Sequence, residues 1–147
     1  MTRSQHRNWL YVTAFTIASF GPVFWAGSML AFNAPSAFTL DLLSWPPLDG
    51  YPNAQGSATR FMFAIGSGLL MGLGTMIVCM AWWLYDQQPE AVRKSVVTGL
   101  LFWFVFDSTG SILSGHASNA IFNIGILLLA VGPLWRPAQE DRAIAKA

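Results

Sequence analysis

The sequence predicts an all-α integral membrane protein with four transmembrane helices packed as an antiparallel bundle. Composition is the first reason: 54% of the 147 residues are hydrophobic and 10% are charged, whereas soluble domains average about 25% charged residues. The second is the presence of four apolar stretches with lengths that suit a hydrocarbon core, which takes about 20 helical residues to cross. The third is the length of the chain, which suits one domain and contains no internal repeat. A single membrane domain over residues 1–147 is therefore predicted.

The four predicted membrane spans are separated by one long and two short connections. They cover residues 9–32, 60–85, 96–113 and 118–135. In the first span, Pro22 removes the backbone donor that the carbonyl of Ala18 would use in a helix, so we expect a bend there. Gly115 and the neighbouring serines suit a tight turn between the third and fourth spans. These two spans should therefore form a hairpin.

The long connection, residues 33–58, is rich in proline and glycine, which excludes a continuous helix. Residues 36–45 are predicted to form a short helix with Ser36 as its N-cap. Trp45 and Tyr51 suit the headgroup boundary of a membrane, where an amphipathic ring meets both apolar and polar surroundings. The connection is thus predicted to lie at the interface, either as a loop held to the surface or as a lid over a site.

The distribution of positive charge predicts the orientation in the membrane. All lysines and arginines except Arg60 lie in the N-terminal flank, in residues 86–95 or in the tail, residues 136–147. Cytoplasmic flanks of membrane spans carry an excess of these residues. Both termini are therefore predicted to be cytoplasmic in a bacterial inner membrane, with residues 33–58 outside. The apolar run after the basic N-terminal flank is longer than the roughly 7–15 residues of a signal peptide core, so it is predicted to remain as the first span.

A stripe of small residues runs along one face of the second span. It comprises Ala64, Gly68, Gly72, Thr75 and Cys79. Small residues four apart let another helix approach closely in a membrane. Gly68 and Gly72 are therefore predicted interface residues, together with Trp45 and Tyr51 at the headgroup boundary. Arg60 precedes the stripe by about one helical turn, so we expect its side chain to point the same way, into the bundle.

The polar run at residues 106–123 contains one carboxylate between two apolar spans. Asp107 and Ser111 share a face of the third span at i and i+4, and Asn119 and Asn123 share a face of the fourth. At about 1.5 Å per residue from the turn, Asp107 lies roughly 10 Å below the membrane boundary. A carboxylate at that depth costs on the order of 2.5–3.5 kcal/mol and needs a partner.

The predicted ligand-binding cluster consists of Arg60, Asp107, Ser111, Asn119, Asn123 and His116. Three partners are open to Asp107: Arg60, from the same side of the membrane, could supply a charge-assisted bond, Asn123, at about the same level, an amide donor, and Ser111 a hydroxyl. If Arg60 does not reach Asp107, burial favours the protonated carboxyl. Three roles fit such a cluster: a clasp between helices, a binding site for a small molecule, lipid headgroup or quinone, and part of a proton or ion path. A single carboxylate without a chain of others favours the first two.

Other kinds of function are not indicated. The net charge of +1, without a basic patch, indicates no nucleic-acid partner. A lone cysteine, Cys79, gives neither an intramolecular disulfide nor a cysteine metal cluster. His116 together with Asp107 falls short of a metal shell. The sequence contains no triad arrangement or phosphate loop, so no catalytic residue, metal or cofactor is predicted.

The size, the four spans and the glycine-rich second span resemble in layout the DoxX-like group of small bacterial membrane proteins. This resemblance implies neither a function nor site residues. The sequence predicts a non-catalytic structural or accessory subunit that associates with itself or with a larger membrane complex. The alternative is a membrane protein, with enzymes and carriers included, that binds a small molecule, lipid or quinone around Asp107. A bonded cluster without a cavity would favour the first function, and a cavity beneath Trp45 and Tyr51 the second.

Overall fold

The computed structural model describes residues 1–50 and 56–139. Its helices, in chain order, are α1 (Arg3–Gly27), α2 (Ala34–Leu43), α3 (Ser57–Trp83), α4 (Pro89–Leu113), α5 (Ala117–Val131) and the 3₁₀ helix η1 (Gly132–Leu134). Within the described residues, four helical stretches are long and apolar enough to cross a membrane, namely α1, α3, α4, and α5 together with η1. The all-α class with four helices of membrane length is thus confirmed. Tyr51 and residues 140–147 of the predicted tail lie outside the described residues.

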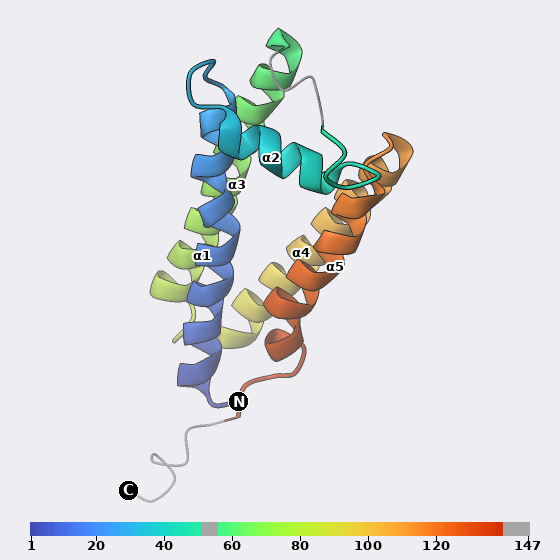
Figure 1. The fold of residues 1–147 in the computed structure, drawn as a ribbon. Helices are drawn as coiled ribbons and strands as arrows, with labels where there is room; N and C mark the ends of the chain where they lie inside the picture. Colours follow the sequence, from blue (N-terminus) through green and yellow to red (C-terminus); the bar gives the residue numbers. More distant parts are fainter. Residues whose placement is uncertain (51–55, 140–147) are drawn as a thin grey trace, which may run out of the picture.

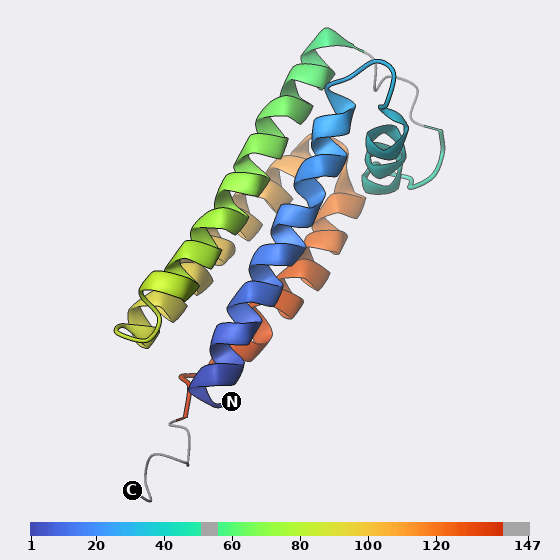
Figure 2. The same cartoon turned by 90° about the vertical axis from the view of Figure 1, so that its left-hand side faces the viewer.

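The long helices are arranged as two pairs (Figures 1 and 2). α1 lies beside α3, and α4 lies beside α5, while α2 lies across the end of the bundle and contacts α1 and α5. The N-terminus and the end of η1 lie at the opposite end, where the backbone N–H of Gln139 donates to the carbonyl of Met1 at 2.8 Å. Figure 1 shows the two pairs close together at this end and further apart toward α2. The crossing direction of each helix in a membrane stays a prediction.

Two helices begin well before the apolar spans predict, because their first turns are polar. α1 begins at Arg3 rather than residue 9, and Thr2 and Gln5 form a capping box in which each side chain bonds the backbone N–H of the other. α4 begins at Pro89 rather than residue 96, with proline in its first turn, where the missing N–H has no helical partner anyway. Hydropathy marks the apolar part of a helix, not its ends.

The long connection also differs in detail from the prediction. α2 begins at Ala34, before the expected start at residue 36. Ser36 does not cap it: the residue is buried, and its hydroxyl donates to the carbonyl of Val23 in α1. This bond anchors α2 to α1. The α-helix of α1 continues across Pro22 and ends at Gly27 rather than at residue 32.

Close packing of α1 against α3 depends on Gly74. A Cβ added there would lie 2.7 Å from the Cβ of Ala18 and 2.8 Å from the carbonyl oxygen of Ala14, so the two backbones touch at this point. Gly68 and Gly72 behave differently, because both are exposed and a Cβ added to either meets no described atom within 4 Å. The small-residue stripe therefore faces away from the rest of the chain, and the expectation that it points into the bundle is wrong.

The hydrophobic core lies at the end of the bundle that holds the N-terminus and η1. All four long helices contribute buried residues to it, among them Leu10, Ala14, Ile17, Ile77, Ala81, Val92, Val96, Leu100 and Ala130. Toward α2 the two helix pairs are not joined by such a core. This difference leaves room between the pairs on the side of α2.

Candidate ligand-binding site

Four of the six predicted cluster residues form one hydrogen-bonded group between α4 and α5. Oδ2 of Asp107 accepts a bond from Nδ2 of Asn119 at 2.9 Å and another from Nδ2 of Asn123. The same nitrogen of Asn119 donates to Oγ of Ser111 at 2.7 Å. Nδ2 of Asn123 also donates to Oγ of Ser108 at 3.2 Å. Ser108 is buried and was not predicted, although its position beside Asp107 in an apolar helix was a usable signal.

The α4–α5 turn explains why these side chains meet. Gly115 has a φ of +83°, a backbone conformation that suits glycine, so the chain reverses sharply there. The bonded pairs Ser111–Asn119 and Asp107–Asn123 are 8 and 16 residues apart in sequence, and both are centred on Gly115. Each successive helical turn away from the hairpin thus brings one further polar pair together.

Arg60 is not a partner of Asp107. Within the described residues, the hydrogen bonds to Asp107 come from the two asparagines, and Arg60 forms no ion pair with it. Nε of Arg60 is buried and has no hydrogen-bond partner there. The predicted pairing is therefore absent, although Arg60 is half-buried.

A cavity of about 490 Å³ lies between the two helix pairs, beneath α2. Helices α1, α2, α3, α4 and α5 all contribute to its wall. The polar residues of its lining are Asp107, Asn119, Asn123, His116 and Thr39. The other lining residues are apolar. The polar cluster therefore forms part of the wall of an otherwise apolar cavity.

The cavity is polar at one end and apolar at the other. Ile17 and Leu100 belong both to its lining and to the hydrophobic core, which lies toward the N-terminus and η1. Asp107 lies two helical turns further along α4 than Leu100, which is roughly 10 Å at 1.5 Å per residue. A molecule bound here would have its polar group near α2 and its apolar part near the core.

Trp45 and His116 occupy different places in relation to this cavity. Trp45 is exposed and lines a separate depression on α4 and α5, so the cavity lies beneath α2 and not beneath Trp45. His116 lines the cavity at the start of α5, and its Nδ1 lies 3.0 Å from the carbonyl oxygen of Ser114. His116 is therefore part of the site, but Trp45 is not.

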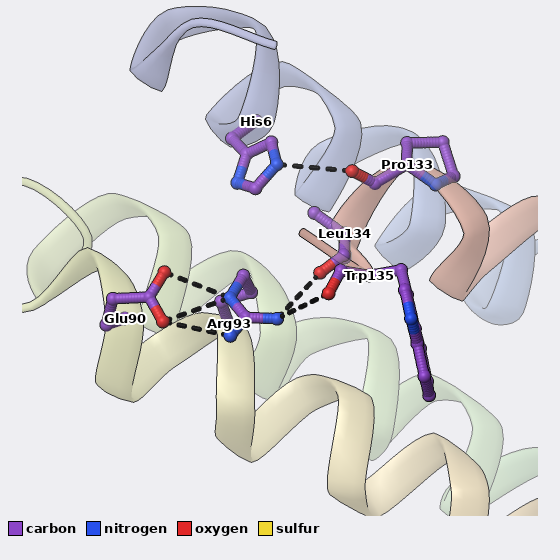
Figure 3. Close-up of polar contacts among 6 residues, drawn as sticks. All are labelled: His6, Glu90, Arg93, Pro133, Leu134 and Trp135. Atoms are coloured by element: carbon purple, nitrogen blue, oxygen red, sulfur yellow. Dashed lines mark hydrogen bonds and ion pairs between the residues drawn. The ribbon is translucent and has the colours of Figure 1, made fainter. Parts of the chain in front are cut away.

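A second polar group lies at the opposite end of the bundle and was missed by sequence reasoning (Figure 3). Nη1 of Arg93 donates to the carbonyls of Leu134 and Trp135 at 3.0 and 3.1 Å, while Nε and Nη2 bind the carboxylate of Glu90. His6, which is buried, donates from Nε2 to the carbonyl of Pro133 at 3.2 Å. These bonds satisfy carbonyls at a helix end that lack helical partners. The group is structural, since it fixes η1 to α1 and α4.

Comparison of the chain with protein-family models, with curated proteins and with solved structures found no match.

Proposed function

We propose that this chain is an integral protein of a bacterial inner membrane that binds a small amphiphilic molecule, such as a lipid or a quinone, between its two helix pairs. The observation that supports this function is the position of the polar cluster, which lies at one end of an otherwise apolar cavity. Most small-molecule sites combine an apolar wall with a few convergent polar groups in this way.

The pattern of hydrogen bonds argues against a purely structural clasp. The bonds of Asp107 join α4 to α5, two helices that their short turn already holds together, and none of them reaches α1 or α3. Asparagine and serine alone supply interhelical bonds in membranes. A carboxylate adds an insertion cost of about 2.5–3.5 kcal/mol, which a packing role does not require. A binding role accounts for it.

The size of the cavity also suits a ligand. Pockets for small molecules typically measure about 300–1,000 Å³, and this one measures about 490 Å³. α2 covers its polar end and is attached to α1 through the Ser36–Val23 bond. A ligand would therefore enter from the side, between the helix pairs, directly from the lipid.

Filling the cavity should abolish binding. Ile126 lines the cavity, whereas Ile124, two residues earlier on α5, lines the separate outer depression. We expect Ile126→Trp to lose the small molecule that the wild-type protein retains after gentle extraction, because the larger ring occupies its space, and Ile124→Trp to retain it. Native mass spectrometry measures the bound mass. Equal retention by both variants would contradict the proposed site.

Association through the outer face of α3 is a second candidate function. One observation favours it: Gly68 and Gly72 are exposed and unoccupied by the described chain, which leaves a surface where a second helix can pack closely. Such a protein would associate with further copies of itself, or would be an accessory subunit of a larger membrane complex. The same mass spectra test this, since the assembly mass should fall to that of the monomer in Gly72→Ile. A wild-type protein that is already monomeric would rule out self-association.

The proposed orientation places both termini in the cytoplasm. The N-terminal flank and the α3–α4 connection lie at the same end, where Arg7 bonds Asp86 at 2.9 Å. In a Cys79→Ser background, a membrane-impermeant thiol reagent added outside should label Ser114→Cys but not Gln87→Cys. The reverse labelling pattern would invert the orientation.

A further inference from the structure

We infer that the ligand of this cavity carries a protonated amine, and that Asp107 binds it. This inference rests on the proposed function and narrows its ligand to an amphiphile with an amine, which excludes a quinone. Four features of the cavity lead to it: the hydrogen-bonding capacity left over by the cluster, the charges around Asp107, the aromatic residues in the wall, and the apolar inner end.

The amide donors of the cluster are already used. An asparagine amide has two N–H groups. Those of Asn119 bind Asp107 and Ser111, and those of Asn123 bind Asp107 and Ser108. No amide N–H is therefore left for a ligand.

Acceptors, in contrast, remain. Both bonds to Asp107 reach Oδ2, so Oδ1 accepts none from the described residues. The amide oxygens of Asn119 and Asn123 are acceptors too, and all three residues line the cavity. A ligand group that binds these acceptors must donate hydrogen bonds, and an ammonium group does so with up to three N–H donors.

The negative charge of Asp107 favours a cationic ligand group over a neutral hydrogen-bond donor. Within the described residues, no lysine or arginine lines the cavity, and its other titratable group, His116, bonds the turn at Ser114. A cationic ligand would balance the carboxylate through a charge-assisted bond, which is stronger than a neutral one. A carboxylate or phosphate headgroup would instead meet the like charge of Asp107 and be repelled by it.

Aromatic side chains around the same space favour a cation as well. Phe20, Phe24, Trp103 and Phe122 line the cavity. Phe20 of α1 and Phe122 of α5 meet edge to face with ring centroids 6.0 Å apart, so the aromatic wall spans both helix pairs. Aromatic faces attract ammonium groups. The apolar inner end near Ile17 and Leu100 would hold the hydrocarbon part of the ligand.

The test compares four probes with the same octyl chain: octylamine, octanol, N-octylacetamide and octanoate. Native mass spectrometry in a non-ionic detergent gives the Kd of each. We expect octylamine to bind about tenfold or more tightly than octanol. N-octylacetamide has an N–H donor but no charge and should resemble octanol, and octanoate should bind most weakly.

Matched variants locate the effect. Asp107→Asn should reduce octylamine binding to the level of octanol, whereas Asp49→Asn, at an exposed acid after α2, should not. If Asp107→Asn does not fold, the comparison of octylamine with N-octylacetamide on the wild-type protein decides the matter. If all four probes bind the wild-type protein with equal affinity and Ile126→Trp abolishes this binding, the inference of an amine ligand is wrong but the proposed function stands. Lack of saturable binding by any probe, or binding that Ile126→Trp does not change, would overturn both.

Discussion

Replacing Gly74 with alanine is expected to destabilise the protein, whereas the same replacement at Gly72 should leave it unchanged or slightly more stable. At Gly74 the new Cβ would lie 2.7 Å from Ala18 Cβ and 2.8 Å from the carbonyl oxygen of Ala14. Neither atom belongs to a flexible side-chain end, so α1 and α3 must move apart. Overpacking of this kind costs about 1–3 kcal/mol.

Gly72→Ala is the matched control, two residues along the same helix. Its Cβ would meet no described atom within 4 Å. Alanine favours a helix over glycine by up to about 1 kcal/mol. Thermal unfolding of both variants in the same detergent, followed by circular dichroism, measures the difference. A stability loss at Gly72 equal to that at Gly74 would show that α1 and α3 do not meet as described.

Replacing Arg93 with methionine is the second change with a large expected effect. Its guanidinium holds the carbonyls of Leu134 and Trp135 as well as the carboxylate of Glu90. Leu134 is fully buried, so its carbonyl has little access to another donor. Hydrogen bonds to charged groups contribute about 1.5–3 kcal/mol each, so we expect a loss of roughly 2–4 kcal/mol.

Lys94→Met, at the exposed neighbouring residue, controls for the loss of one positive charge and should change stability little. Glu90→Gln leaves the carbonyl bonds of Arg93 in place and should cause a smaller loss than Arg93→Met. The free energy of unfolding of the three variants, measured in the same detergent, tests this order. If Lys94→Met and Arg93→Met are equally stable, the bonds to the end of α5 and η1 do not contribute.

For the small-residue stripe on α3, the sequence predicted the wrong face of the helix to pack inside the bundle. Helical spacing identified Ala64, Gly68 and Gly72 as one face, but the buried residues of α3, including Ser67 and Gly74, form another face with the same spacing. In a soluble protein, polar residues would mark the outer face. In a membrane the outer face is as apolar as the inner one, so periodicity alone does not say which face packs.

The error on Arg60 follows from the same cause. The side chain of Arg60 was predicted to point inward only because it continues the stripe. The stripe faces outward, so the basis for a bond between Arg60 and Asp107 is lost. The pairing of Asp107 with Asn123, in contrast, depended only on counting residues from a tight turn at Gly115. The structure contains that pairing.

The sequence by itself predicted the all-α class, the four membrane-length helices and the proximity of Asp107 and Asn123 across the α4–α5 hairpin. These features depend on local composition, on the helical repeat and on one short turn, all of which act over a few neighbouring residues. Only the tertiary structure decided that α1 packs on α3 through Gly74, that Arg93 binds the end of α5 and η1, and that the pairs separate toward α2. Those features depend on contacts between segments far apart in the chain. The cavity beside Asp107 is a consequence of them.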